Sequence, residues 1–114
     1  MYSVIIIGGG LAGLTSSIEL ARRGIQVLLI ERKNYPHHKV CGEYISNEVK
    51  PYLGSLGLSL NALNPSTIST FQFTSPRGSM LTTPLDLGGF GVSRYTLDEA
   101  LYKLATSLGV TFCL

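Results

Sequence analysis

Three glycines near the start of the chain have the spacing of a phosphate-binding turn. Gly8, Gly10 and Gly13 fit the pattern G-x-G-x-x-G between an apolar run and an amphipathic segment. In such a turn Gly8 permits the tight bend, Gly10 lets a pyrophosphate approach the backbone, and Gly13 lets a helix pack closely on a strand. The amides of Leu11 and Ala12 would then point from the helix N-terminus toward the phosphates.

An acidic residue follows where a ribose would lie. Glu31 comes 18 residues after Gly13, and its carboxylate can accept both hydrogen bonds of an adenosine ribose diol. The same charge would repel a 2′-phosphate, which disfavours NADP. The glycines and the acid together predict a dinucleotide site that fits both FAD and NAD.

The elements that must position these residues form one βαβ unit. We expect strands over residues 3–7 and 26–30, and both are almost wholly apolar, as is typical of parallel strands covered on both faces. The amphipathic run 11–23 between them predicts a helix, with Gly24 as its left-handed cap.

A polar stretch and a hairpin follow. Residues 33–45 are polar and turn-like, and Ser46 is placed to cap a short helix after them. The extended segments 67–74 and 79–85 flank the turn Ser75-Pro76-Arg77-Gly78, which predicts a β-hairpin.

The end of the chain predicts a second long helix and a last strand. After a loop over 87–93, Thr96 and Glu99 form a capping box that opens a helix ending near Leu108, and residues 110–114 form a strand. The fold class is therefore α/β, a partial Rossmann-like FAD/NAD(P)-binding domain with a parallel βαβ core and an inserted β-hairpin.

Composition narrows the classes of function. The 114 residues are 45% hydrophobic and 14% charged, which is ordinary for one globular domain. The net charge of +2 is scattered, so we expect no nucleic-acid partner. Two cysteines, Cys41 and Cys113, favour a reducing cytoplasm, and the apolar start breaks at Gly8, so we expect neither a signal peptide nor a transmembrane segment.

Two other candidates for chemistry have simpler explanations. The pair His37-His38 lies beside Pro36 without further ligands at a recognisable spacing, so a solvated turn explains it better than a metal site. No motif near Cys41 would activate its thiol, and a free cysteine is more often a small buried hydrophobe. We therefore expect no metal, and no general acid or base is identified.

Two long stretches resemble a known enzyme family. They are "YSVIIIGGGLAGLTSSIELARRGIQVLLIERKNYPHHKVCGEYIS" and "GFGVSRYTLDEALYKLATSLGV". Both resemble the N-terminal part of the FAD-dependent oxidoreductases that include geranylgeranyl reductases, flavin-dependent halogenases and aromatic-ring hydroxylases of the p-hydroxybenzoate hydroxylase type. The resemblance is strongest over 3–32, weaker at 39–43 and 94–98, and weakest between 50 and 85. It implies FAD as the cofactor.

The resemblance also implies further site residues. Glu31 and Arg32 would lie along the adenosine half of FAD, the residue matching Arg94 would reach the cofactor, and the Cys41-Gly42 turn would pass near the ribityl or flavin end. From the residues alone, the guanidinium of Arg94 can meet either a phosphate or solvent. Gly42 fits either close approach to a flat ring or an ordinary turn.

The function expected from the sequence is the FAD-binding portion of a flavin-dependent oxidoreductase of the reductase, monooxygenase or halogenase type. Its substrate would be an apolar or aromatic small molecule. The alternatives are an NAD-dependent dehydrogenase and a non-catalytic nucleotide-binding module. Because a doubly wound sheet has about five or six strands, residues 1–114 are expected to be the N-terminal part of the domain. Alone, they would be inactive, bind FAD weakly or not at all, and self-associate through the bare edge at residues 4–7.

Overall fold

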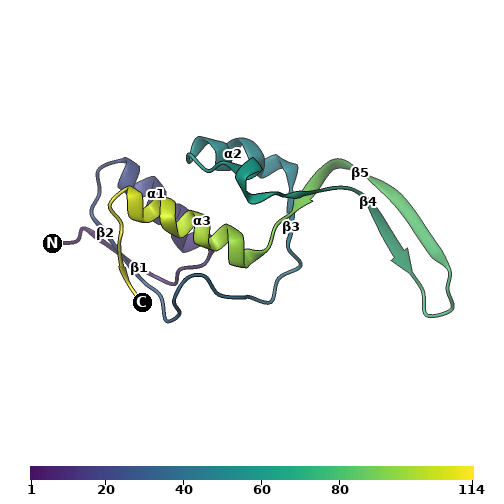
Figure 1. The fold of residues 1–114 in the computed structure, drawn as a ribbon, viewed down its shortest axis with the longest axis horizontal. Coiled ribbons are helices and arrows are strands. Elements are labelled where there is room, and N and C mark those ends of the chain that lie inside the picture. Colours follow the sequence, from purple (N-terminus) through teal and green to yellow (C-terminus); the bar gives the residue numbers. More distant parts are fainter.

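The computed structural model describes residues 1–114 (Figure 1). The helices and strands are, in chain order, β1 (Val4–Ile7), α1 (Leu11–Arg22), β2 (Val27–Ile30), β3 (Tyr44–Ser46), α2 (Lys50–Ser55), β4 (Ser66–Thr74), β5 (Met80–Gly91), α3 (Arg94–Ser107) and β6 (Thr111–Cys113). Short 3₁₀ turns lie at Asn47–Val49 and Leu60–Leu63. No helix combines the length and the apolar character that crossing a membrane requires.

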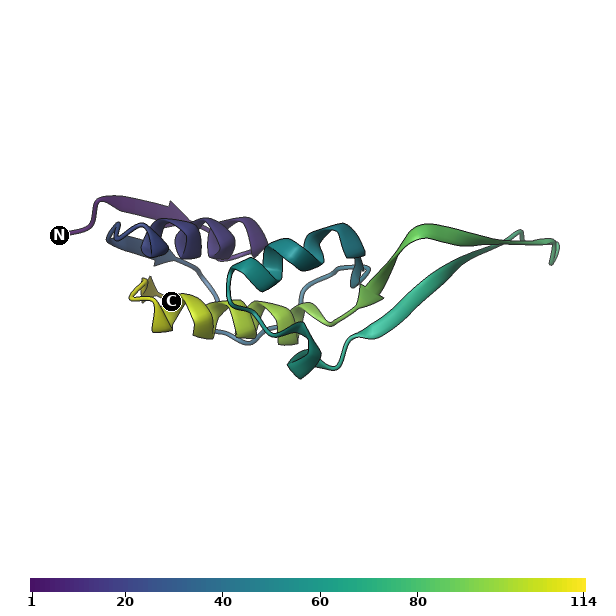
Figure 2. The same ribbon diagram turned by 90° about the horizontal axis from the view of Figure 1, so that it is seen from above.

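The first sheet is parallel, in the order β1-β2-β6, as expected for a βαβ core. The helices α1 and α3 run side by side over one of its faces (Figures 1 and 2). The fully buried side chains between these layers are Leu14, Ile18, Val27, Leu29, Leu97, Leu101 and Ala105. This core fixes the turn between β1 and α1 against the end of β2.

The other face of this sheet is open. Ile5 pairs in register with Leu28 and Ile7 with Ile30, which places all four side chains on the face away from the helices. Ile5 is 60% exposed and Ile7 is 84% exposed. The expectation that both faces would be covered is therefore wrong within this chain. The expected bare edge is confirmed, because β1 pairs with β2 alone.

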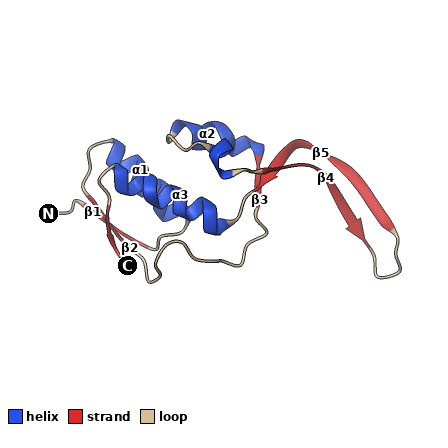
Figure 3. Cartoon of the chain, in the orientation of Figure 1, coloured by secondary structure: helices blue, strands red, loops and turns tan.

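The second sheet is the antiparallel array β3-β5-β4, and it contains the expected hairpin. The hairpin formed by β4 and β5 projects from the body of the molecule, which is 60 Å long (Figures 1 and 3). Phe71 and Phe73 lie on one face opposite Thr83 and Leu81, and both phenylalanines are exposed. The hairpin therefore presents an apolar surface far from the parallel sheet.

Two expectations near the second sheet are wrong. The expected loop 87–93 is mostly strand, because β5 continues to Gly91 as the central strand and pairs with β3. The ring of Tyr44 lies so close to β5 that a Cβ on Gly89 would collide with it, which explains why a glycine occurs inside this strand. The polar stretch 33–45 likewise ends in a strand, not in a turn.

The start of α3 also differs from the prediction. The helix begins at Arg94, because the hydroxyl of Ser93 accepts a hydrogen bond from the Thr96 amide at 3.2 Å and so caps it. Thr96 lies inside the helix, and Glu99 pairs with Lys103 at 3.0 Å. The predicted capping box is therefore wrong, since a better cap lies three residues earlier.

We expect Gly13→Ala to lower the free energy of unfolding by about 1–3 kcal/mol, because a Cβ there would collide with the Gly8 carbonyl oxygen. Gly54→Ala is the matched control. A Cβ at that helical position meets nothing within 4 Å, so alanine should be neutral or stabilise by up to about 1 kcal/mol. Urea unfolding followed by circular dichroism measures both; equal stabilities for the two variants would contradict the close packing.

Candidate functional site

The turn after β1 has the geometry that its glycines predict. Gly8 has φ +102, a conformation that favours glycine, and its amide donates to the carbonyl of Ile30 at 2.8 Å. Gly13 lies against the carbonyl of Gly8, which leaves no room for a side chain. The roles assigned to these two glycines are therefore confirmed.

Gly10 is different, because the fold does not require a glycine there. It has φ −76 and ψ −171, which any residue adopts, and a Cβ would meet only the Nζ atom of Lys39, at 3.5 Å. Gly10 is the N-cap of α1, no side chain caps the helix, and its first turn contains no acidic residue. The amides of Leu11 and Ala12 precede the first helical hydrogen bond, from Leu14 to the Gly10 carbonyl. This helix N-terminus is thus open to an anion.

Glu31 lies beside this loop, as the sequence predicts. Its carboxylate accepts hydrogen bonds from the Gly9 amide at 2.7 Å and the Lys33 amide at 3.1 Å. Partial burial acts to raise its pKa, but these amides and the charge of Lys39 outweigh burial and hold the pKa below its ordinary value. Since a carboxylate has about four acceptor positions, two remain for a diol.

A polar cleft of about 390 Å³ opens next to Glu31. Its lining residues are Glu31, Arg32, Lys33, His37, His38, Lys39 and Val40. The histidines have local partners: His37 contacts the Asn34 carbonyl at 3.0 Å, and His38 stacks on Tyr95. Glu31 and Arg32, the two residues that the resemblance assigns to the adenosine half of FAD, both line this cleft.

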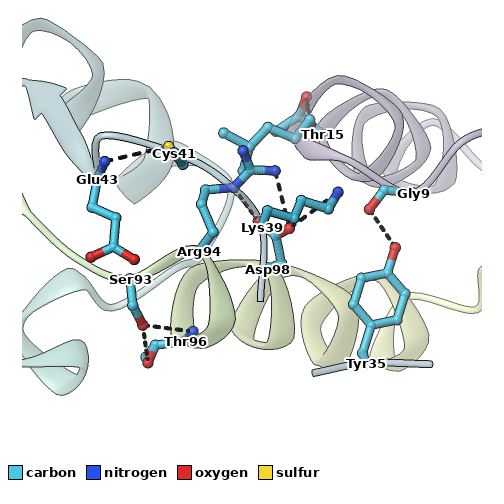
Figure 4. Close-up of polar contacts among 11 residues, drawn as sticks. Gly9, Thr15, Tyr35, Lys39, Cys41, Glu43, Ser93, Arg94, Thr96 and Asp98 are labelled. Atoms are coloured by element: carbon cyan, nitrogen blue, oxygen red, sulfur yellow. Dashed lines mark hydrogen bonds and ion pairs between the residues drawn. The ribbon is translucent and has the colours of Figure 1, made fainter. Parts of the chain in front are cut away.

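Tyr35 is a residue of the site that sequence reasoning missed. Its hydroxyl donates a hydrogen bond to the carbonyl of Gly9 (Figure 4). Its ring stacks on Tyr102 of α3 with centroids 4.6 Å apart, and burial raises the pKa of the hydroxyl well above its ordinary value. The hydroxyl is protonated at neutral pH, as in any tyrosine, and is the donor of this hydrogen bond. An isolated tyrosine in a polar loop carries no motif that would have identified it.

Arg94 is tied to an acidic residue of its own helix. Its guanidinium forms two hydrogen bonds with the carboxylate of Asp98, at 2.8 and 3.1 Å, and these raise the pKa of Arg94 above its ordinary value. Lys39 contacts the same carboxylate at 3.6 Å (Figure 4). Lys39 links these side chains to the glycine loop, because its Nζ atom lies 3.5 Å from the position of a Cβ on Gly10. Asp98 and Lys39 were not singled out from the sequence.

Gly42 lies apart from the glycine loop. It lines a second pocket of about 460 Å³ at the base of the hairpin, together with Ser93 and Thr96. A Cβ on Gly42 would meet nothing within 4 Å, so neither packing nor a left-handed backbone requires a glycine there. No part of this chain fills the space beside Gly42, so a group from outside the chain can lie there.

Comparisons with known proteins identify the domain. A family model described as an FAD binding domain matches residues 1–99. The chain is 41% identical over 59 residues to digeranylgeranylglycerophospholipid reductase of Sulfolobus acidocaldarius, covering 50% of this chain and 12% of that protein. It is 34% identical over 80 residues to aklavinone 12-hydroxylase DnrF of Streptomyces peucetius, covering 70% and 13%. The structure of the flavin-dependent brominase Bmp2 matches with a TM-score of 0.81 at 27% identity, over 99% of this chain and 29% of that one.

These matches decide between the two dinucleotides that fit the glycines and Glu31. The family model and the brominase both point to a flavin, so the cofactor is FAD and not NAD. The chain spans less than a third of the length of each of these proteins.

We expect Tyr35→Phe to lower the free energy of unfolding by about 0.5–1.5 kcal/mol, because the Gly9 carbonyl loses its donor. It should also speed hydrogen exchange at the Gly9 amide. Tyr102→Phe, which keeps the stacked ring and removes a hydroxyl that makes no hydrogen bond to the chain, is the control. Urea unfolding and amide exchange measure the two effects, and equal values for both variants would show that the Tyr35 hydroxyl does not hold the loop.

Proposed function

Because the chain belongs to the FAD binding domain family, we propose that its glycine loop binds the diphosphate of FAD and that Glu31 accepts the adenosine ribose diol. The observation that carries this proposal is Gly10, where neither backbone conformation nor packing calls for a glycine. A branched side chain at this uncapped helix N-terminus would meet no part of the chain except the flexible end of Lys39, so it would chiefly obstruct a group approaching from outside.

Each residue of the site has a binding role in this proposal. The first-turn amides of Leu11 and Ala12 would donate to phosphate oxygens, where the helix dipole also favours negative charge. Arg32 lies beside Glu31 in the polar cleft, on the adenosine side. Gly42 would let the flavin end pass close to the backbone, and Arg94 would add positive charge near the diphosphate.

The complete protein is proposed to be a flavin-dependent oxidoreductase that acts on an apolar or aromatic small molecule. Bound FAD supplies the redox chemistry, and the protein supplies orientation and electrostatics. The matched proteins are named as a reductase, a hydroxylase and a brominase, which supports all three types equally. No residue of this chain is assigned a catalytic role. The two free cysteines support a reducing, cytoplasmic compartment.

We also propose that residues 1–114 are the N-terminal part of the FAD-binding domain and are inactive alone. The open sheet face and the bare edge of β1 support this, since such surfaces are normally covered. The small share of each matched protein that the chain covers agrees with it.

We expect the chain to bind FAD more weakly than micromolar and Gly10→Val to abolish that binding without changing the circular dichroism spectrum. Flavin fluorescence anisotropy with increasing protein measures weak affinities. Glu31→Gln should weaken binding by about tenfold, since it removes the charged acceptor of the diol. Unchanged affinity in Gly10→Val would contradict the proposed site.

We expect the chain to self-associate through the open face and edge of the parallel sheet. Light scattering should show dimers or larger species, and the double variant Ile5→Thr/Ile7→Thr should shift them toward monomers, because threonine keeps the strand and removes apolar surface. Phe71→Thr/Phe73→Thr on the hairpin is the comparison. A monomeric wild-type chain, or loss of association only in the hairpin variant, would contradict this assignment.

A further inference from the structure

One fully buried carboxylate holds two cations that come from distant parts of the chain. Asp98, in the first turns of α3, has no exposed surface. It binds the guanidinium of Arg94 through both oxygens and lies 3.6 Å from the ammonium of Lys39, which comes from the loop after β2 (Figure 4). We call these three residues the Asp98 cluster.

The two cations are not equally satisfied. Arg94 makes a bidentate pair, the strong geometry for a guanidinium. Lys39 has three N–H donors, and its distance of 3.6 Å from Asp98 is that of an ion pair and not of a hydrogen bond. The Asp98 cluster therefore carries one more positive than negative charge, and the N–H donors of Lys39 make no hydrogen bond within the chain.

The ammonium of Lys39 also lies at the glycine loop. Its Nζ atom is 3.5 Å from the position of a Cβ on Gly10, the N-cap of α1. A positive charge at the positive end of a helix dipole is unfavourable unless an anion lies between them. Glu31, the other nearby acid, feels the charge of Lys39, which helps to lower its pKa, but it forms no ion pair with Lys39 and takes its hydrogen bonds from the amides of Gly9 and Lys33. The side chain of Lys39 is 27% exposed, so a ligand can reach it.

We propose that Lys39 binds the diphosphate of the cofactor directly, and that Asp98 is a positioning residue that holds Lys39 and Arg94 against the glycine loop. This inference rests on the proposed binding of FAD at that loop. It adds a phosphate ligand from outside the glycine motif and gives the acid of α3 a role in binding.

The first test is the Lys39→Met variant of the full chain. Affinity for FAD and for ADP, which share the diphosphate, should fall by about tenfold to a hundredfold, the effect of losing a charge-assisted hydrogen bond. FAD affinity comes from fluorescence anisotropy, and ADP affinity from its displacement of FAD or from calorimetry. Binding by the variant should also depend less on salt.

Lys103→Met is the matched control. It removes one positive charge, as Lys39→Met does. Lys103 lies on α3, and its exposed side chain pairs with Glu99, outside the Asp98 cluster. FAD affinity should change less than twofold. Equal losses in both lysine variants, or no loss in Lys39→Met, would overturn the direct contact.

The second test uses the sign of a charge change at Asp98. Asp98→Asn makes the site more positive, so general attraction of an anion predicts tighter binding of FAD. If Asp98 instead holds the cations in place, Asp98→Asn should bind FAD more weakly than the wild type, and the affinity of Asp98→Glu should lie between the two. If Asp98→Asn does not fold, Asp98→Glu decides: affinity below that of the wild type supports positioning, and equal affinity overturns it.

The outcomes separate the two proposals. If the complete protein binds neither FAD nor ADP, the proposed function of the glycine loop is wrong. If the wild type binds both and Gly10→Val does not, while Lys39→Met binds as well as the wild type, the loop is the site and only the role of Lys39 is wrong.

Discussion

The backbone of Gly9 is held at both its amide and its carbonyl, and the arrangement of the site depends on these two contacts. Its amide donates to Glu31 at the end of β2, and its carbonyl accepts from Tyr35 in the following loop. Tyr35 in turn stacks on Tyr102, so the turn after β1 is fixed to α3 as well as to β2. Because the next residues begin α1, these two hydrogen bonds hold the loop that leads into the N-terminus of that helix.

The same contacts give Glu31 two functions that share one carboxylate. Part of its hydrogen-bonding capacity holds the loop, and the remainder faces a polar cleft. The carboxylate thus helps to hold the fold of the loop even before any ligand is considered. Burial acts to raise the pKa of Glu31, but the amides that donate to it and the charge of Lys39 lower it below its ordinary value.

Positive charge gathers where the glycines leave the backbone open. The uncapped N-terminus of α1 and the cations of the Asp98 cluster meet around Gly10, and the buried acid keeps those cations at fixed positions. The apolar surfaces of the chain lie elsewhere, on the open face of the parallel sheet and on the hairpin. The polar surface around the glycine loop and the apolar surfaces of the chain therefore lie in different parts of the fold.

The local elements were predictable because their signals lie in neighbouring residues. The glycine spacing, the apolar runs and the turn Ser75-Pro76-Arg77-Gly78 correctly predicted the βαβ unit and the hairpin. The predicted capping box failed for a local reason: Ser93, three residues earlier, already satisfies the amide of Thr96. The prediction of a loop over 87–93 failed because residues 89–91 are a strand through pairing with both β3 and β4, and both partners are distant in sequence.

By itself, the sequence determined the fold class, the glycine loop and the acid beside it, since each depends on spacing along one βαβ unit. Tertiary structure alone decided the contacts of Tyr35 and of Lys39, which it brought to Asp98. Their partners are distant in sequence or depend on how α3 packs against α1, and no spacing rule links a loop lysine to a buried helix acid. Side-chain charges reach one another only after the hydrophobic core has fixed the helices, and that step places the cations at the loop.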